Sequence, residues 1–241
     1  MSISEILPLV PQALWESFYM VAATTLFAYV IGLPLGVALI VTDKNGLHPM
    51  RGVSAVLGWI VNIGRSLPFA ILLVALMPFT RALVGTAIGV KGAIPPLVIS
   101  AAPFVARMVE TSLSEVDAGV VEAAQAMGAS PLQIVRKVYL PESMPSLVLG
   151  GAISVVTILA YTAIAGMVGA GGLGDIAIQY GHNRGVTSLM WVTVLFLIIF
   201  VQIIQWVFNW WSKHIDKRLD HSSDTKKFAP LEMLAHFVHT K

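Results

Sequence analysis

The 241-residue sequence contains no cysteine, which removes disulfide bridges, iron–sulfur clusters and thiol nucleophiles from consideration. Charge is also scarce: Asp, Glu, Lys and Arg together make up 12% of the residues, whereas a soluble domain carries about a quarter. Hydrophobic residues reach 56%, and the mean hydropathy is +0.80. This composition predicts an integral membrane protein. The small net charge of +2, without a basic stripe interleaved with aromatic residues, gives no reason to expect nucleic-acid binding.

Several motifs of catalysis are missing or lack their context. No stretch matches GxxxxGK[ST], so any ATP-driven work must come from another polypeptide. The segment 169–174 reads GxGxxG, but it follows an apolar helix and not a strand, which argues against a dinucleotide site. The six histidines are scattered, and the pair His236 and His239 is too little to predict a metal site. No serine, histidine and carboxylate cluster indicates a hydrolase.

Long apolar segments predict an all-α protein with five transmembrane helices, because a span needs roughly 20 apolar residues. The first basic residue is Lys44, so the N-terminus lacks the positive region of a cleaved signal peptide, and the first apolar segment is expected to remain as a span. The expected spans lie near residues 18–42, 53–79, 88–109, 144–170 and 186–211. Residues 1–17 are then an external N-terminal segment, 18–212 the transmembrane domain and 213–241 a C-terminal tail.

Lysine and arginine favour one orientation of these spans. The segments 43–52, 107–142 and 213–241 hold eleven of these residues, whereas the opposite side holds only Arg81, Lys91 and Arg184. The N-terminus is therefore predicted to lie outside, and the 107–142 segment and the tail are predicted to be cytoplasmic.

The cytoplasmic segment contains a helical elbow, by which we mean residues 117–141. Asp117 is a candidate N-cap for a first short helix, and Gly128 provides the left-handed residue that ends it. Ser130, Pro131 and Gln133 then form a second helix start with a capping box. Leu132, Val135 and Val138 or Tyr139 are expected to form one apolar stripe, and Pro141 to stop the helix.

Other features of the spans suggest close packing or a path through the membrane. Gly169, Gly171, Gly172 and Gly174, together the glycine loop, predict a closely packed helix end at the outer mouth that could act as a hinge. Gly32 and Gly36 form a GxxxG pair that permits packing within one subunit or across a dimer. Arg65 lies inside an apolar segment, either in a translocation path or reaching back to the interface. Tyr161, Ile164 and Met167 are further candidates to line or constrict such a path.

The elbow resembles a known signature. Glu122-Ala123-Ala124, Gly128, Ile134 and Leu140-Pro141 have the spacing of the EAA motif of permease subunits of bacterial ABC importers. More narrowly, the segments 65–69, 102–110, 126–129, 135–138, 169–174 and 179–181 resemble those of methionine importer permeases, and the likeness covers roughly residues 13–218.

This resemblance implies a type I ABC importer permease fold and a role as a non-catalytic membrane subunit. It implies a homodimer in the bacterial inner membrane, two ATP-binding subunits that hold Mg-ATP, and a periplasmic or lipoprotein methionine-binding protein. The cargo would be methionine, with related derivatives. Glu122, Ala123, Ala124, Gly128, Ala129, Ile134, Leu140 and Pro141 would couple the ATPase to the spans, with no cofactor or metal in this chain.

Three alternatives remain open. The same machinery could carry another small nutrient, because the span residues do not reveal the chemistry of the cargo. A stand-alone channel or ion-coupled carrier would transport without an ATPase and would be expected to hold acidic residues within its spans. A membrane enzyme would need an acid, base or metal constellation that the sequence does not offer.

Overall fold

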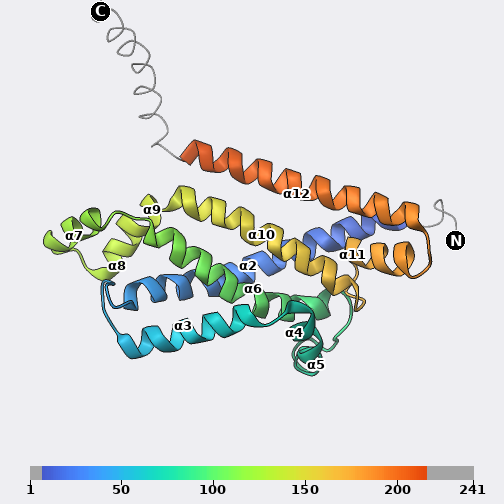
Figure 1. Ribbon diagram of the computed structural model, residues 1–241, viewed down its shortest axis with the longest axis horizontal. Helices are drawn as coiled ribbons and strands as arrows, with labels where there is room; N and C mark the ends of the chain where they lie inside the picture. The colour runs from blue at the N-terminus through green and yellow to red at the C-terminus, as the bar shows by residue number, and fades with distance from the viewer. Residues whose placement is uncertain (1–6, 216–241) are drawn as a thin grey trace, which may run out of the picture.

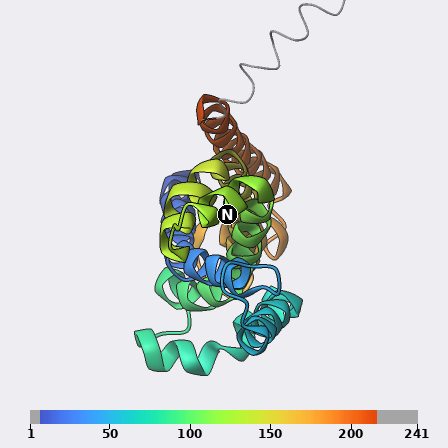
Figure 2. The ribbon, with the colours of Figure 1, turned by 90° about the vertical axis from the view of Figure 1, so that its left-hand side faces the viewer.

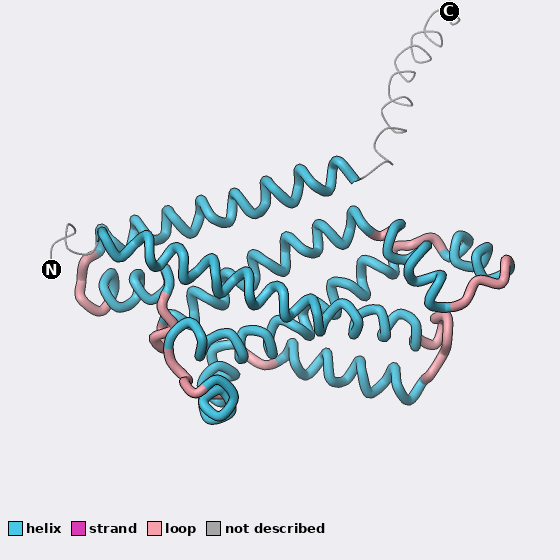
Figure 3. The backbone as a smooth tube through the Cα atoms, turned by 180° about the vertical axis from the view of Figure 1, so that it is seen from behind, coloured by secondary structure: helices cyan, strands magenta, loops and turns pink. Residues whose placement is uncertain are grey.

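The computed structural model describes residues 7–215, and the expected tail beyond residue 215 lies outside them. Within that range every regular element is helical (Figure 3). The long helices are α2 (Val10–Thr42), α6 (Gly89–Ser114), α10 (Met144–Gly166) and α12 (Thr187–Ile215), preceded by a short turn η1 (Leu7–Leu9). Each of the four is long and apolar enough to cross a membrane.

The shorter helices connect these spans and form the two ends of the bundle. Between α2 and α6 lie α3 (Arg51–Ser66), α4 (Phe69–Ala75) and α5 (Met77–Val84). The elbow consists of α7 (Ala118–Ala126), α8 (Pro131–Ile134), the π-helical η2 (Val135–Tyr139) and α9 (Leu140–Glu142). Between α10 and α12 lie α11 (Gly172–Asp175) and the π-helical η3 (Ile176–His182).

The core of the bundle is formed by α2, α6 and α10. Figures 1 and 2 show α12 along one side of this core and α3 along the other. Gly32 and Gly36 of α2 allow the closest contact, because a Cβ on either would lie under 3 Å from backbone or side-chain atoms of α6. The GxxxG pair therefore packs within one subunit, which resolves the alternative left open by the sequence.

The second predicted span, 53–79, was wrong as a single helix. α3 ends at Ser66, and α4 continues at an angle of 97° to it. The cause is local: a residue before proline avoids the α-helical region, and Leu67 has the extended angles φ −80° and ψ 122° in front of Pro68. Arg65 consequently lies in the last turn of α3 and not in the middle of a continuous span.

α2 begins at Val10, with Pro11 in its first turn, so the helix starts eight residues before the predicted span. Its 33 residues correspond to about 50 Å, well beyond the roughly 30 Å hydrocarbon thickness of a bilayer. The first two turns of α2 are thus free to contribute to a site at this end of the bundle.

Candidate functional site

The elbow projects from one end of the bundle, at the left of Figure 1. Its first helix begins as expected, because one carboxylate oxygen of Asp117 accepts hydrogen bonds from the amides of Gly119 (2.8 Å) and Val120 (3.3 Å). α7 then ends in a Schellman motif: the Gly128 amide donates to the Gln125 carbonyl, and the Ala129 amide donates to the Ala124 carbonyl. Gly128 has φ +79°, a left-handed conformation that favours glycine.

The second helix of the elbow begins with a complete capping box. The Ser130 amide donates to the side-chain oxygen of Gln133 at 2.8 Å, and the Gln133 amide donates to Ser130 Oγ at 3.4 Å. The helix continues through a π-helical turn at 135–139 and ends at Glu142, one residue beyond Pro141. Proline is tolerated here because it occupies the first turn of α9, where its missing amide costs little.

One face of the elbow packs into the bundle. Val121, Ala124, Ile134, Val135 and Tyr139 are buried in the same cluster as Val109 and Leu113 of α6. The expected apolar stripe is therefore only partly correct, because Leu132 is 60% exposed and Ile134 takes the buried position. Of the candidate coupling residues, Ala124 and Ile134 hold the elbow against the bundle, and Ala129 and Leu140 are half-buried.

The other face of the elbow is exposed. It carries Glu122, Ala123, Gly128 and Pro141 from the EAA motif. Met127 lies at the turn and is 82% exposed, more than any other large apolar side chain in the described range. A surface of small residues around one protruding, flexible methionine is suited to dock into a groove of another protein. The sequence motif did not single out Met127 for this surface.

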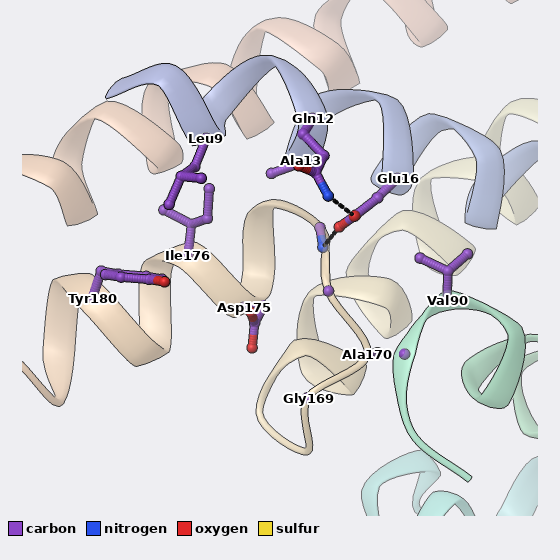
Figure 4. Close-up of a pocket in the computed structure, with 13 residues that line it drawn as sticks. Leu9, Gln12, Ala13, Glu16, Val90, Gly169, Ala170, Asp175, Ile176 and Tyr180 are labelled. Carbon is purple, nitrogen blue, oxygen red and sulfur yellow. Dashed lines mark hydrogen bonds between the residues drawn. The ribbon is translucent and has the colours of Figure 1, made fainter. Parts of the chain in front are cut away.

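The glycine loop lies at the opposite end of the bundle and lines a pocket of about 270 Å³ (Figure 4). The loop is held by the first turns of α2. The Glu16 carboxylate accepts hydrogen bonds from the Gly172 amide and from the side-chain amide of Gln12, both at 2.8 Å, and Ser17 Oγ accepts one from the Leu173 amide at 2.9 Å. Glu16 and Ser17 were missed because the sequence placed them outside the first span.

The glycines of this loop are required by conformation and by space. Gly169, Gly171 and Gly172 have positive φ, and a Cβ on Gly174 would lie 2.3 Å from the Ala163 carbonyl oxygen. A Cβ would clash at Gly171, Gly172 and Gly174, so the loop is closely packed there, whereas the hinge remains a prediction. Asp175, also in the pocket, has its pKa raised by burial and by the nearby negative charge of Glu16.

The candidate path residues are only partly brought together. The ring of Tyr161 stacks on Phe69 of α4 with 4.7 Å between centroids, and Ile164 packs against the same cluster. Met167 is exposed at the end of α10, and Arg65 is exposed at the end of α3. Within residues 7–215 no group of three or more His, Asp or Glu side chains could hold a metal ion.

With this geometry in place, comparison with known proteins defines the class. Residues 28–221 match the family described as "Binding-protein-dependent transport system inner membrane component", and the chain belongs to this family. It is a multi-pass protein of the inner membrane, with the helical arrangement of a type I ABC permease.

Particular relatives are more closely similar. The chain is 50% identical over 206 residues to the probable D-methionine transport system permease protein MetI of Vibrio cholerae, which covers 86% of this chain and 92% of the relative. It is 45% identical over 207 residues to the methionine import system permease protein MetP of Bacillus subtilis, covering 86% and 93%. Among solved structures, a chain of the inward-facing MetNI methionine ABC transporter matches with TM-score 0.87 and 44% identity, covering 90% of this chain and all of that one.

Proposed function

We propose that this chain is the transmembrane permease subunit of an ATP-driven importer and that it moves methionine inward by alternating access. The observation that carries the proposal is the match to the MetNI methionine transporter, which extends over 90% of the chain at 44% identity. The names of the relatives from Vibrio cholerae and Bacillus subtilis support the same cargo.

The proposed complex contains two copies of this chain, two ATP-binding subunits and an external methionine-binding protein. ATP hydrolysis belongs to the partner subunits, since this sequence has no phosphate loop. The exposed face of the elbow, with Glu122, Ala123 and Gly128, supplies the surface that the ATPase would contact. The buried face, with Ala124 and Ile134, would pass movement of the ATPase to α6.

The proposed orientation places the elbow in the cytoplasm and the glycine loop outside. Lys44, Arg51, Arg136 and Lys137 lie at the elbow end of the chain path, which supports this orientation by the distribution of positive charge. Five spans result when the bent pair α3 and α4 is counted as one, with the N-terminus outside and the C-terminus in the cytoplasm.

The test is reconstitution of the chain with its ATPase and its methionine-binding protein in liposomes. We expect labelled methionine to accumulate only when ATP is present on the ATPase side. Uptake by the chain without the ATPase would instead indicate a channel or carrier. Transport of another nutrient in preference to methionine would support the permease role but contradict methionine as the cargo.

A further inference from the structure

α3 has three distinct faces. Leu57, Val61 and Gly64 face the bundle, and Val61 is fully buried. A second face is apolar and exposed, as expected for contact with lipid, and comprises Val53, Val56, Trp59, Ile60 and Ile63. The third is polar: Arg51, Ser54, Asn62 and Arg65 recur at helical spacing, with Gly58 completing the stripe.

The polar face of α3 is continuous with charged residues on α6. Arg107 donates through Nη2 to Asn62 Oδ1 and through Nη1 to Glu110 Oε2, both at 2.7 Å. Close approach of the two helices is possible because Gly64 has no Cβ where Pro103 of α6 packs. Arg107 and Glu110 retain 27% and 24% exposure, so the cluster lies at a surface and not in the core.

The polar surface formed by α3 and α6 is unsuited to contact with lipid hydrocarbon. A charged side chain facing hydrocarbon costs several kcal/mol or more, and such residues normally face the interior of a bundle or a water-filled cavity. Arg107 lies seven residues, about 10 Å, before the end of α6. The chain already presents a separate apolar face of α3 to lipid, so the polar face is expected to border water or the transported molecule.

Two charged side chains in the cluster still have the capacity to bind a further molecule. Arg65 is exposed and forms no hydrogen bond or ion pair with any residue between 7 and 215. Glu110 uses Oε2 for Arg107, while its Oε1 has no hydrogen-bond partner in the described part of the chain. Arg65 follows Asn62 by three residues on the polar face of α3, the face that Arg107 and Glu110 of α6 adjoin. A cation without an ion-pair partner on the same surface as a carboxylate with one unpaired oxygen is complementary to a small zwitterion.

We propose that Asn62, Arg65, Arg107 and Glu110 form a subsite of the translocation path for a zwitterionic amino acid. Glu110 receives the ammonium group and Arg65 the carboxylate, while Arg107 and Asn62 hold Glu110 in position. This subsite rests on the proposed function, and it names the residues of the path that would recognise the cargo.

The first test uses the absence of cysteine from the chain, so that each introduced thiol is unique within it. Gly58→Cys and Thr111→Cys place thiols beside the cluster, and Trp59→Cys places a control on the apolar face of α3. In the complete complex in lipid nanodiscs without nucleotide, a charged maleimide should label the first two about tenfold faster than the control, since apolar surroundings suppress the reactive thiolate. Methionine should slow both reactions. Labelling as slow as that of the control would overturn the proposal, because lipid or the second copy would then cover the face.

The second test measures methionine imported per ATP hydrolysed in proteoliposomes. Arg65→Gln and Glu110→Gln should each lower this ratio about tenfold, the effect of losing one charged hydrogen bond to the cargo. Arg65→Lys and Glu110→Asp should restore part of it, and Arg81→Gln, an exposed arginine of α5, is the matched control.

Equal losses in the conservative and neutral variants would indicate a tether between α3 and α6 and would overturn the subsite. So would an unchanged ratio in the neutral variants. Failure of the proposed function has a different signature, since the unsubstituted complex would then import no methionine.

Discussion

Gly128 in the elbow and Gly172 in the glycine loop have almost the same positive φ, +79° and +78°. Their surroundings differ. A Cβ added to Gly128 would meet nothing within 4 Å, whereas one added to Gly172 would lie 2.6 Å from Ser17 Oγ and 2.9 Å from the end of Met20. The elbow needs glycine for its local turn, and the loop needs glycine also for packing against α2.

The same contrast holds for the hydrogen bonds of the two regions. The caps of the elbow join residues two to five positions apart, as in Asp117 to Gly119, Ser130 to Gln133 and Ala124 to Ala129. The loop is fixed by Glu16 and Ser17, each 156 residues away from its partner in the sequence. The turns of the elbow are therefore specified by neighbouring residues, whereas the loop acquires its shape only when the bundle is assembled.

The largest effect is expected at the exposed elbow. Gly128→Asp should reduce coupled methionine uptake at least about tenfold, because the new carboxylate strains the turn and intrudes on the ATPase surface. Membrane insertion should be unchanged, as measured by the amount of folded protein in the membrane.

Two controls separate the causes in this experiment. Gly128→Ala keeps the strain without the charge, and Gly52→Asp puts the same charge at an exposed glycine of α3 where an added Cβ meets nothing. Normal uptake by the Gly128→Asp complex would remove the elbow from the coupling mechanism.

In the glycine loop, Gly172→Ala should lower the free energy of unfolding by about 2–4 kcal/mol, because backbone strain adds to the clash with Ser17. Gly185→Ala is the matched control: φ is +73° there, but an added Cβ meets nothing within 4 Å, so a loss of about 1–2 kcal/mol from strain alone is expected. Thermal denaturation in detergent compares the two. Equal losses would mean that packing against α2 contributes little.

A smaller effect is expected at Glu16. Glu16→Ala leaves the Gly172 amide without its acceptor, which should cost about 1–3 kcal/mol. Glu16→Gln retains a carbonyl oxygen at the same place and should lose less. If thermal denaturation gives the same midpoint for both variants, the hydrogen bond to Gly172 is not what holds the loop.

The smallest effect concerns pH. The pKa of Asp175 is raised in the folded state, so folding favours its protonated form. Stability from this group is fully present below the ordinary aspartate pKa, about 3.9, and is lost as pH rises through the raised value. Asp175→Asn should therefore raise the melting temperature at pH 7.5, and the difference from the unsubstituted chain should shrink toward pH 4. A difference independent of pH would contradict this assignment.

Much of the elbow was predictable because its determinants are adjacent in sequence. Asp117, Gly128 and the Ser130–Gln133 capping box were all identified from residue type and spacing, and all form as expected. Leu132 was predicted to face the core and is exposed instead. Apolar spacing alone cannot distinguish a surface that packs within the chain from one that is left for a partner.

The spans were predictable in approximate position, but not in their interruptions. Four of the five expected segments contain one long helix each, because hydrophobic length is a local property. The break at Leu67 and Pro68 was missed, although the proline was visible in the sequence, because proline within a span is often accommodated, as Pro34 is in α2.

By itself, the sequence determined the membrane class, the five apolar segments, the position of the positive charges and the conformation of the elbow. Each of these depends on composition or on residues within a few positions of one another. Only the tertiary structure brought Glu16 and Ser17 to the glycine loop and Asn62 to Arg107 and Glu110. These contacts join residues from 45 to 156 positions apart, and no local pattern encodes which distant partner a polar side chain meets when the helices pack.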